Sequence, residues 1–158
     1  MTPTMRQQDI SSEEGSVRKA DPLASLAIHH GGISVADLEA SIAWYREMLG
    51  FELEQRLHIA QIPAEVAFIR RGDFRIELFE LAGAAPLPAE RREPQADLRV
   101  HGHKHLCFRV ADAPACFASM REKGADIVFE SVVDGTPMGF LRDNTGNLLE
   151  LIQCSTDG

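Results

Sequence analysis

The stretches HGGISVAD at residues 30–37 and HLCFRVAD at residues 105–112 decide the fold of this chain. They lie 75 residues apart, and each begins with histidine and ends in Val-Ala-Asp. Apolar residues occupy the fourth and sixth positions of both, and this alternation predicts a β-strand with one buried face. A helical pattern follows each stretch, so the two copies begin two equivalent strand–helix units.

Each copy continues into a segment with apolar residues at helical spacing. Asp37 and Asp112 precede these segments at the N-cap position, and Gly50 is placed to end the first helix. The spacing therefore predicts one helix over 38–49 and a second that begins after Asp112. The apolar stripes are Leu38, Ile42, Tyr45 and Leu49 in the first helix, and Ala113, Phe117 and Met120 in the second.

Three strand-like segments follow each helix, and tight turns at 71–73 and 143–147 join the last two of each set. We therefore predict an α+β fold of two tandem βαβββ modules, 23–81 and 103–154, which form a cupped, eight-stranded mixed sheet. The predicted strands after the helices are 51–57, 65–71 and 74–81, then 126–132, 138–142 and 148–153.

Two segments lie outside the repeat. Residues 1–22 are polar and rich in Ser, Glu and Gln, which is typical of a disordered tail. Residues 82–102 contain three prolines and mixed charge, which predicts a linker or long surface loop.

Composition excludes several classes of function. A formal net charge of −8 disfavours a nucleic-acid partner, because phosphate binding needs a basic surface. No apolar run approaches the roughly 20 residues of a membrane span, and the N-terminus lacks the apolar core of a signal peptide. The three cysteines show no CxxC spacing, so we expect buried free thiols and a cytoplasmic setting.

The repeat singles out His30 and His105 on the first strands and Glu77 and Glu150 on the last. Because side chains alternate along a strand, all four are expected to face away from the helices, into the cup. Two facing carboxylates in a partly dry cavity repel each other, whereas a divalent cation between them removes that repulsion. Imidazole and carboxylate groups are ordinary ligands for Zn, Ni, Co, Mn and Fe, so we predict one divalent ion per site.

A lone histidine in a strand is more often a hydrogen-bonded core residue, and a lone glutamate more often faces solvent. That reading needs four coincidences, since all four residues occupy equivalent repeat positions. Competing histidines are His29, expected to point to the helix side or outwards, His103, expected at the rim, and His58, expected on the surface or pocket wall. Alternation also nominates pocket-lining residues: Phe68, Cys107, Arg109, Met138 and Phe140.

These residues resemble the vicinal oxygen chelate superfamily of glyoxalase I, bleomycin resistance proteins and extradiol dioxygenases. The motifs that carry the resemblance are HGGISVADLEASIAWYREMLGFE at 30–52, HLCFRV at 105–110 and RDNTGNLLELI at 142–152, and the similarity spans about 26–153. The resemblance implies that His30, Glu77, His105 and Glu150 are metal ligands. It also implies a small-molecule substrate and a homodimer whose site combines modules of one chain or of two.

The resemblance implies an isomerase, epimerase or lyase that moves a proton next to a metal-chelated carbonyl, with Glu150 and Glu77 as proton-shuttle candidates. A glutathione substrate is disfavoured, since Ser34 and Leu81 stand where glyoxalase I-like enzymes have Arg and Asn. A separate base of the methylmalonyl-CoA epimerase type is also disfavoured, because Gln61, which cannot act as a base, stands at the nearest aligned position, with Glu65 a few residues on. The alternatives are an Fe(II)-dependent dioxygenase using His30, His105 and Glu150, and a non-catalytic binder of small molecules.

Overall fold

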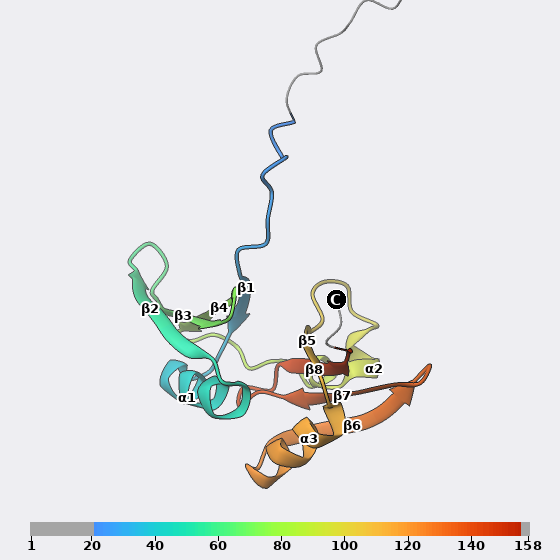
Figure 1. Ribbon diagram of the computed structural model, residues 1–158. Coiled ribbons are helices and arrows are strands. Elements are labelled where there is room, and N and C mark those ends of the chain that lie inside the picture. The colour runs from blue at the N-terminus through green and yellow to red at the C-terminus, as the bar shows by residue number, and fades with distance from the viewer. Residues whose placement is uncertain (1–20, 156–158) are drawn as a thin grey trace, which may run out of the picture.

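The computed structural model describes residues 21–155, so nearly all of the predicted tail over 1–22 lies outside the described residues. Two modules follow one another along the chain, and each is a strand, a helix and three further strands (Figure 1). The first consists of β1 (Gly31–Ser34), α1 (Leu38–Leu49), β2 (Glu52–Ile59), β3 (Ala64–Arg71) and β4 (Phe74–Leu81). The second consists of β5 (Leu106–Val110), α3 (Ala113–Glu122), β6 (Asp126–Val133), β7 (Thr136–Arg142) and β8 (Leu148–Gln153).

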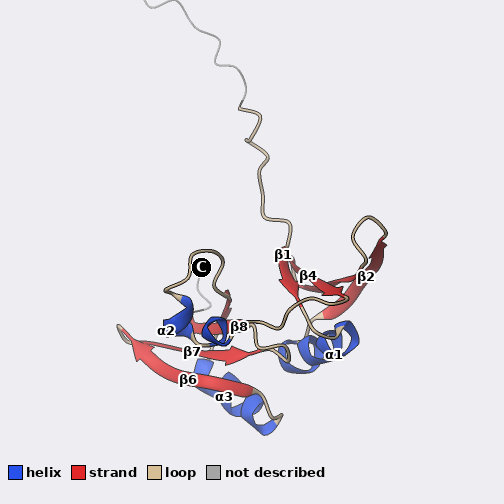
Figure 2. Cartoon of the chain, turned by 180° about the vertical axis from the view of Figure 1, so that it is seen from behind, coloured by secondary structure: helices blue, strands red, loops and turns tan. Residues whose placement is uncertain are grey.

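Each module forms its own hydrogen-bonded sheet, with the orders β1-β4-β3-β2 and β5-β8-β7-β6. In both sheets the first strand pairs in parallel with the last, and the other pairs are antiparallel. The predicted α+β fold with eight strands is thus confirmed, divided into two four-stranded sheets. Each helix covers one face of its sheet, α1 on the first and α3 on the second (Figures 1 and 2).

The helices begin and end where the sequence predicts. Asp37 and Asp112 cap them, each accepting a hydrogen bond from a backbone N–H three residues ahead. Gly50 ends α1 at a positive φ of 65°, a conformation that glycine adopts without strain. Every residue of the two predicted apolar stripes is buried, and these residues join one core that both modules share.

A buried hydrogen bond fastens α1 to the second module. The Tyr45 hydroxyl donates to Asp143 Oδ2 at 3.0 Å, and Asp143 lies in the turn between β7 and β8. Asp143 Oδ1 also accepts the backbone N–H groups of residues 145, 146 and 147, each at 2.9 Å. Burial raises the pKa of Tyr45 well above its usual value of 10, and the neighbouring Asp143 carboxylate raises it further.

The same turn holds the end of β1. Asn147 Nδ2 donates to the Ser34 carbonyl at 3.3 Å, and the Ala36 N–H donates to Thr145 Oγ1 at 3.1 Å. The first residues of β1 and β5 also meet, since a Cβ placed on Gly31 would lie 3.4 Å from Leu106 Cδ2. The two first strands are therefore neighbours at the junction of the modules.

The connection between the modules contains two short helices, η1 (Ala89–Arg92) and α2 (Pro94–Asp97). Asp97 is buried there, pairs with Arg91 and lies 3.4 Å from Lys104 Nζ. Arg142 of β7 donates to the Arg92 carbonyl at 2.8 Å. These contacts fix the connection against the second module. No helix among residues 21–155 is long and apolar enough to cross a membrane.

One expectation about the core is wrong. The three cysteines are free thiols, but none is buried: Cys107 is exposed, and Cys116 and Cys154 are intermediate. For Cys107 the reason is that β5 is an edge strand and that Cys107 alternates with Leu106 and Phe108, which pack against the core.

Candidate metal centre

Strand register places each predicted glutamate beside a predicted histidine. In the parallel pairs, Glu77 lies opposite Gly32 and Glu150 lies opposite Cys107. His30 and His105 stand one residue before β1 and β5, and side-chain alternation gives them the same face as those two partners. The duplicated topology thus builds the same histidine–glutamate pair twice.

Both pairs are in direct contact. His30 Nε2 lies 3.0 Å from Glu77 Oε2, and His105 Nε2 lies 2.9 Å from Glu150 Oε2. The glutamate side chains are 15% and 14% exposed, and the histidine side chains 33% and 28%. Each imidazole therefore reaches from the rim onto a largely buried carboxylate.

A third histidine–glutamate pair shows what is particular to these two. His58 of β2 contacts Glu65 of β3 at 2.7 Å, but its side chains are 60% and 61% exposed. It has no counterpart in the second module, and its exposure places His58 on the surface, one of the two positions expected for it. Burial and repetition, rather than contact alone, distinguish the two candidate pairs.

An aromatic ring backs each candidate histidine. The centroids of His30 and Phe68 are 5.3 Å apart, and those of His105 and Phe140 are 4.8 Å apart, both edge to face. Phe68 pairs with Glu77 across β3 and β4, and Phe140 pairs with Glu150 across β7 and β8. The predicted lining positions Phe68 and Phe140 therefore form the wall behind each imidazole.

The two pairs form two separate sets of donors. Gly31 and Leu106, which directly follow the two histidines, are in contact. Within residues 21–155, however, the structure gathers no group of three or more His, Cys, Asp or Glu side chains close enough to hold an ion. Each pair thus presents one nitrogen and one oxygen, half of the predicted set of four donors.

The chemistry of these donors fits a divalent first-row metal. Two imidazole nitrogens and two carboxylate oxygens suit Zn, Ni, Co, Mn or Fe and leave coordination positions open. The carboxylates are sheltered from water, which strengthens their attraction for a cation. The close contact inside each pair already brings one nitrogen and one oxygen to about 3 Å from each other.

Two contacts beside the pairs were not predicted from the sequence. His29 is exposed, as predicted, yet its Nδ1 lies 2.7 Å from His30 Nδ1. Cys107 lies beside Glu150, and burial, followed by its hydrogen bond to that carboxylate, raises the pKa of the thiol to about 12. Neither contact has a counterpart in the other module, so the repeat gave no signal for it.

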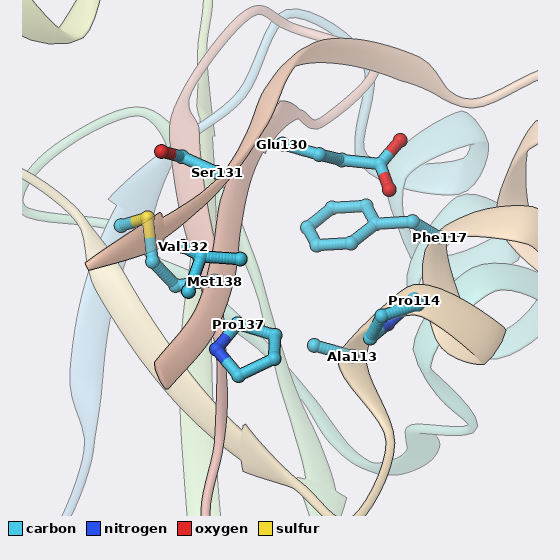
Figure 3. A pocket seen from close by; sticks show the side chains of 8 residues that line it. All are labelled: Ala113, Pro114, Phe117, Glu130, Ser131, Val132, Pro137 and Met138. Atoms are coloured by element: carbon cyan, nitrogen blue, oxygen red, sulfur yellow. The ribbon is translucent and has the colours of Figure 1, made fainter. Parts of the chain in front are cut away.

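A cavity of about 280 Å³ lies between α3 and the β6–β7 hairpin, on the helix side of the second sheet. Phe117 and Pro114 of α3 face Pro137 and Val132 of the hairpin across it (Figure 3). It contains none of the four candidate ligands and is separate from the candidate metal centre.

Comparisons with known proteins agree on one family. The family model described as the glyoxalase/bleomycin resistance protein/dioxygenase superfamily matches residues 27–151. An ethylmalonyl-CoA/methylmalonyl-CoA epimerase of Cereibacter sphaeroides is 31% identical over 132 residues, which cover 80% of this chain and 96% of that protein. A 2-epi-5-epi-valiolone epimerase of an Actinomyces species is 29% identical over 150 residues, which cover 81% and 79%. The crystal structure of a glyoxalase family protein from Enterococcus faecalis superposes with a TM-score of 0.69 at 26% identity, covering 80% of this chain and 96% of that one.

Proposed function

Because the chain belongs to the glyoxalase/bleomycin resistance protein/dioxygenase superfamily, we propose that it is a metal-dependent epimerase or isomerase of a small oxygenated substrate. One observation carries the proposal: two sheltered histidine–glutamate pairs occupy equivalent positions of the two modules. The names of the relatives support epimerisation and differ in the substrate that they state.

His30, Glu77, His105 and Glu150 would hold one divalent ion. When bound, such an ion polarises a carbonyl oxygen and stabilises the negative charge that develops on it as a neighbouring proton is removed.

Epimerisation requires that a proton leaves one face of a carbon and returns on the other. Glu77 and Glu150 come from different modules, so at one ion shared by both pairs each would reach the substrate from its own sheet. A carboxylate on each side suits removal on one face and return on the other. Two glutamates at equivalent positions of the modules therefore favour an epimerase over an enzyme that uses a single base.

The four ligands come either from one chain or from two chains of a dimer. Within one chain, Gly31 meets Leu106 on the helix side of the two first strands, opposite to His30 and His105, so this contact leaves the two pairs apart. Mixing the variants H30A and H105A distinguishes the two arrangements, because intact sites reappear in mixed dimers only if two chains share a site.

Exchange of a substrate proton with solvent tests the proposed chemistry. The metal-loaded protein is incubated in D₂O with racemic methylmalonyl-CoA and, separately, with a ketone bearing a neighbouring hydroxyl. Deuterium gain next to the carbonyl is followed by mass spectrometry. We expect exchange with at least one substrate, and loss of it in E77Q and E150Q.

The exposed pair of His58 and Glu65 provides the matched control. E65Q changes a glutamate in contact with a histidine and lies outside the candidate centre, so it should exchange at the wild-type rate. Exchange that persists unchanged in both E77Q and E150Q would contradict the assignment of the proton shuttle.

A further inference from the structure

A cavity of about 820 Å³ lies where the two modules meet, around the free edge of β5. Because no strand among residues 21–155 is hydrogen-bonded to this edge of β5, side chains from both of its faces reach the cavity. Cys107 and Arg109 come from the face that carries His105, and Leu106 and Phe108 come from the helix side. The volume lies within the range of about 300–1,000 Å³ that is usual for small-molecule sites.

The cavity exists because the duplication is not symmetric. At the end of β1, the five-residue turn 143–147 reaches across and forms hydrogen bonds with Ser34 and Ala36. At the equivalent end of β5 stands the two-residue turn Gly72-Asp73. In the described part of the chain no hydrogen bond joins this shorter turn to β5, so the second junction stays open.

The lining of the cavity combines apolar surface with two guanidinium groups. Met48 and Phe74 contribute from the first module, and Phe108 and Met120 from the second. Arg71 borders the cavity from the first module, where it also donates to the Leu49 carbonyl, and Arg109 borders it from the second. The carboxylate at this rim, Asp73, points into solvent and lies 3.7 Å from Arg70.

Arg109 differs from most arginines of this acidic chain. Among residues 21–155, most arginines pair with a carboxylate, as Arg56 does with Glu39 and Arg75 with Glu54. Arg109 forms no ion pair within that range, although the formal net charge is −8. A guanidinium group is planar and donates two parallel hydrogen bonds, so a carboxylate is the partner that fits it.

We propose that this cavity binds an amphipathic carboxylate, with the apolar chain against Phe74, Phe108 and Met120 and the carboxylate at Arg109. Cys107 lines the cavity and stands opposite Glu150, so a ligand here lies next to the candidate metal centre. If the proposed function holds, the ligand is the distal part of the substrate; that identification rests on the proposed function. Binding to the cavity itself does not.

Calorimetric titration of the metal-free protein with octanoate and with octanol tests the site. The two probes share an eight-carbon chain and differ in the carboxylate. We expect octanoate to bind one per chain and about tenfold more tightly than octanol, the gain of one charge-assisted hydrogen bond. R109A should remove this preference and leave octanol binding unchanged.

Two further variants separate the cavity from general effects of charge. R99A removes an exposed arginine of the connecting segment, which lies outside the cavity, and should leave both affinities unchanged. C116F fills part of the cavity from α3 and should weaken both probes together.

Equal affinities of the wild type for the two probes, or an unchanged preference in R109A, would overturn the proposal. Because the titration contains no metal, the two proposals can fail separately. If octanoate binds but the metal-loaded protein exchanges no substrate proton, only the proposed function is rejected. Proton exchange with no octanoate binding rejects the cavity proposal alone.

Discussion

Replacing Tyr45 with phenylalanine removes a buried hydrogen bond between α1 and the second module and leaves the ring in place. A hydrogen bond to a charged group contributes about 1.5–3 kcal/mol to stability. Asp143 retains Asn147 Nδ2 on the same oxygen and three backbone N–H groups on the other. Since the carboxylate stays well bound, we expect a loss at the low end, about 1.5–2 kcal/mol in the free energy of unfolding.

The same variant has a signature in pH. Burial, and then the Asp143 carboxylate, raise the pKa of Tyr45 above 10, so the folded chain keeps the phenol proton at pH values where the unfolded chain has lost it. This stabilisation is complete below about pH 10 and is lost as the pH rises above it. Tyr45 is the single tyrosine, so Y45F should lose stability less steeply than the wild type above that pH.

Urea unfolding followed by the fluorescence of Trp44, the single tryptophan, measures both effects at pH 8 and pH 11. S41A is the matched control, because Ser41 is buried in the same helix and its hydroxyl bonds within α1 to the Asp37 carbonyl. S41A should lose as much stability between pH 8 and pH 11 as the wild type does. The role given to this hydrogen bond would be refuted if Y45F were as stable as the wild type at pH 8 and lost as much stability as the wild type between pH 8 and pH 11.

Other substitutions test the packing and the charges. G139A should cost about 3 kcal/mol by thermal unfolding, because an added Cβ would lie 2.5 Å from the Phe129 carbonyl oxygen; G31A, whose nearest contact is 3.4 Å, should cost under about 1 kcal/mol. Equal losses in the two variants would refute this. D97N should cost about 3–5 kcal/mol in urea, because it leaves Arg91 and Lys104 facing a neutral group at a buried position. E93Q should cost under about 1 kcal/mol, because Glu93 is 58% exposed and Arg142 keeps its second partner Asp126; a larger loss than in D97N would contradict the reasoning.

The repeat made the fold readable from sequence. Both copies contain a first strand, an aspartate N-cap, an apolar helix stripe and a turn before the last strand. Each uncertain segment could therefore be compared with its equivalent, and the helices and eight strands appear where predicted. The histidine–glutamate contacts follow from the same logic, since parallel pairing of first and last strands sets His30 beside Glu77 and His105 beside Glu150. The positions of Phe68 and Phe140 beside the histidines could be predicted from side-chain alternation along the strands.

What the sequence did not reveal lies where the copies differ. The turn of two residues in one module and five in the other closes one junction and opens the second, and alternation carries no information about that. The exposure of Cys107 follows from β5 being an edge strand, which depends on tertiary pairing rather than on local pattern. The contact of His29 with His30 is likewise particular to one module.

Metal content per chain is the most direct test of a single site built from both pairs. Elemental analysis of the untagged protein, dialysed against excess Zn²⁺ or Ni²⁺ and then desalted, should give one equivalent per chain. H30A and H105A should each lose that equivalent, whereas H58A, which removes the exposed pair, should retain it. Two equivalents in the wild type, with one lost in each of H30A and H105A, would show two independent sites. Full occupancy in either variant would remove the ligand assignment.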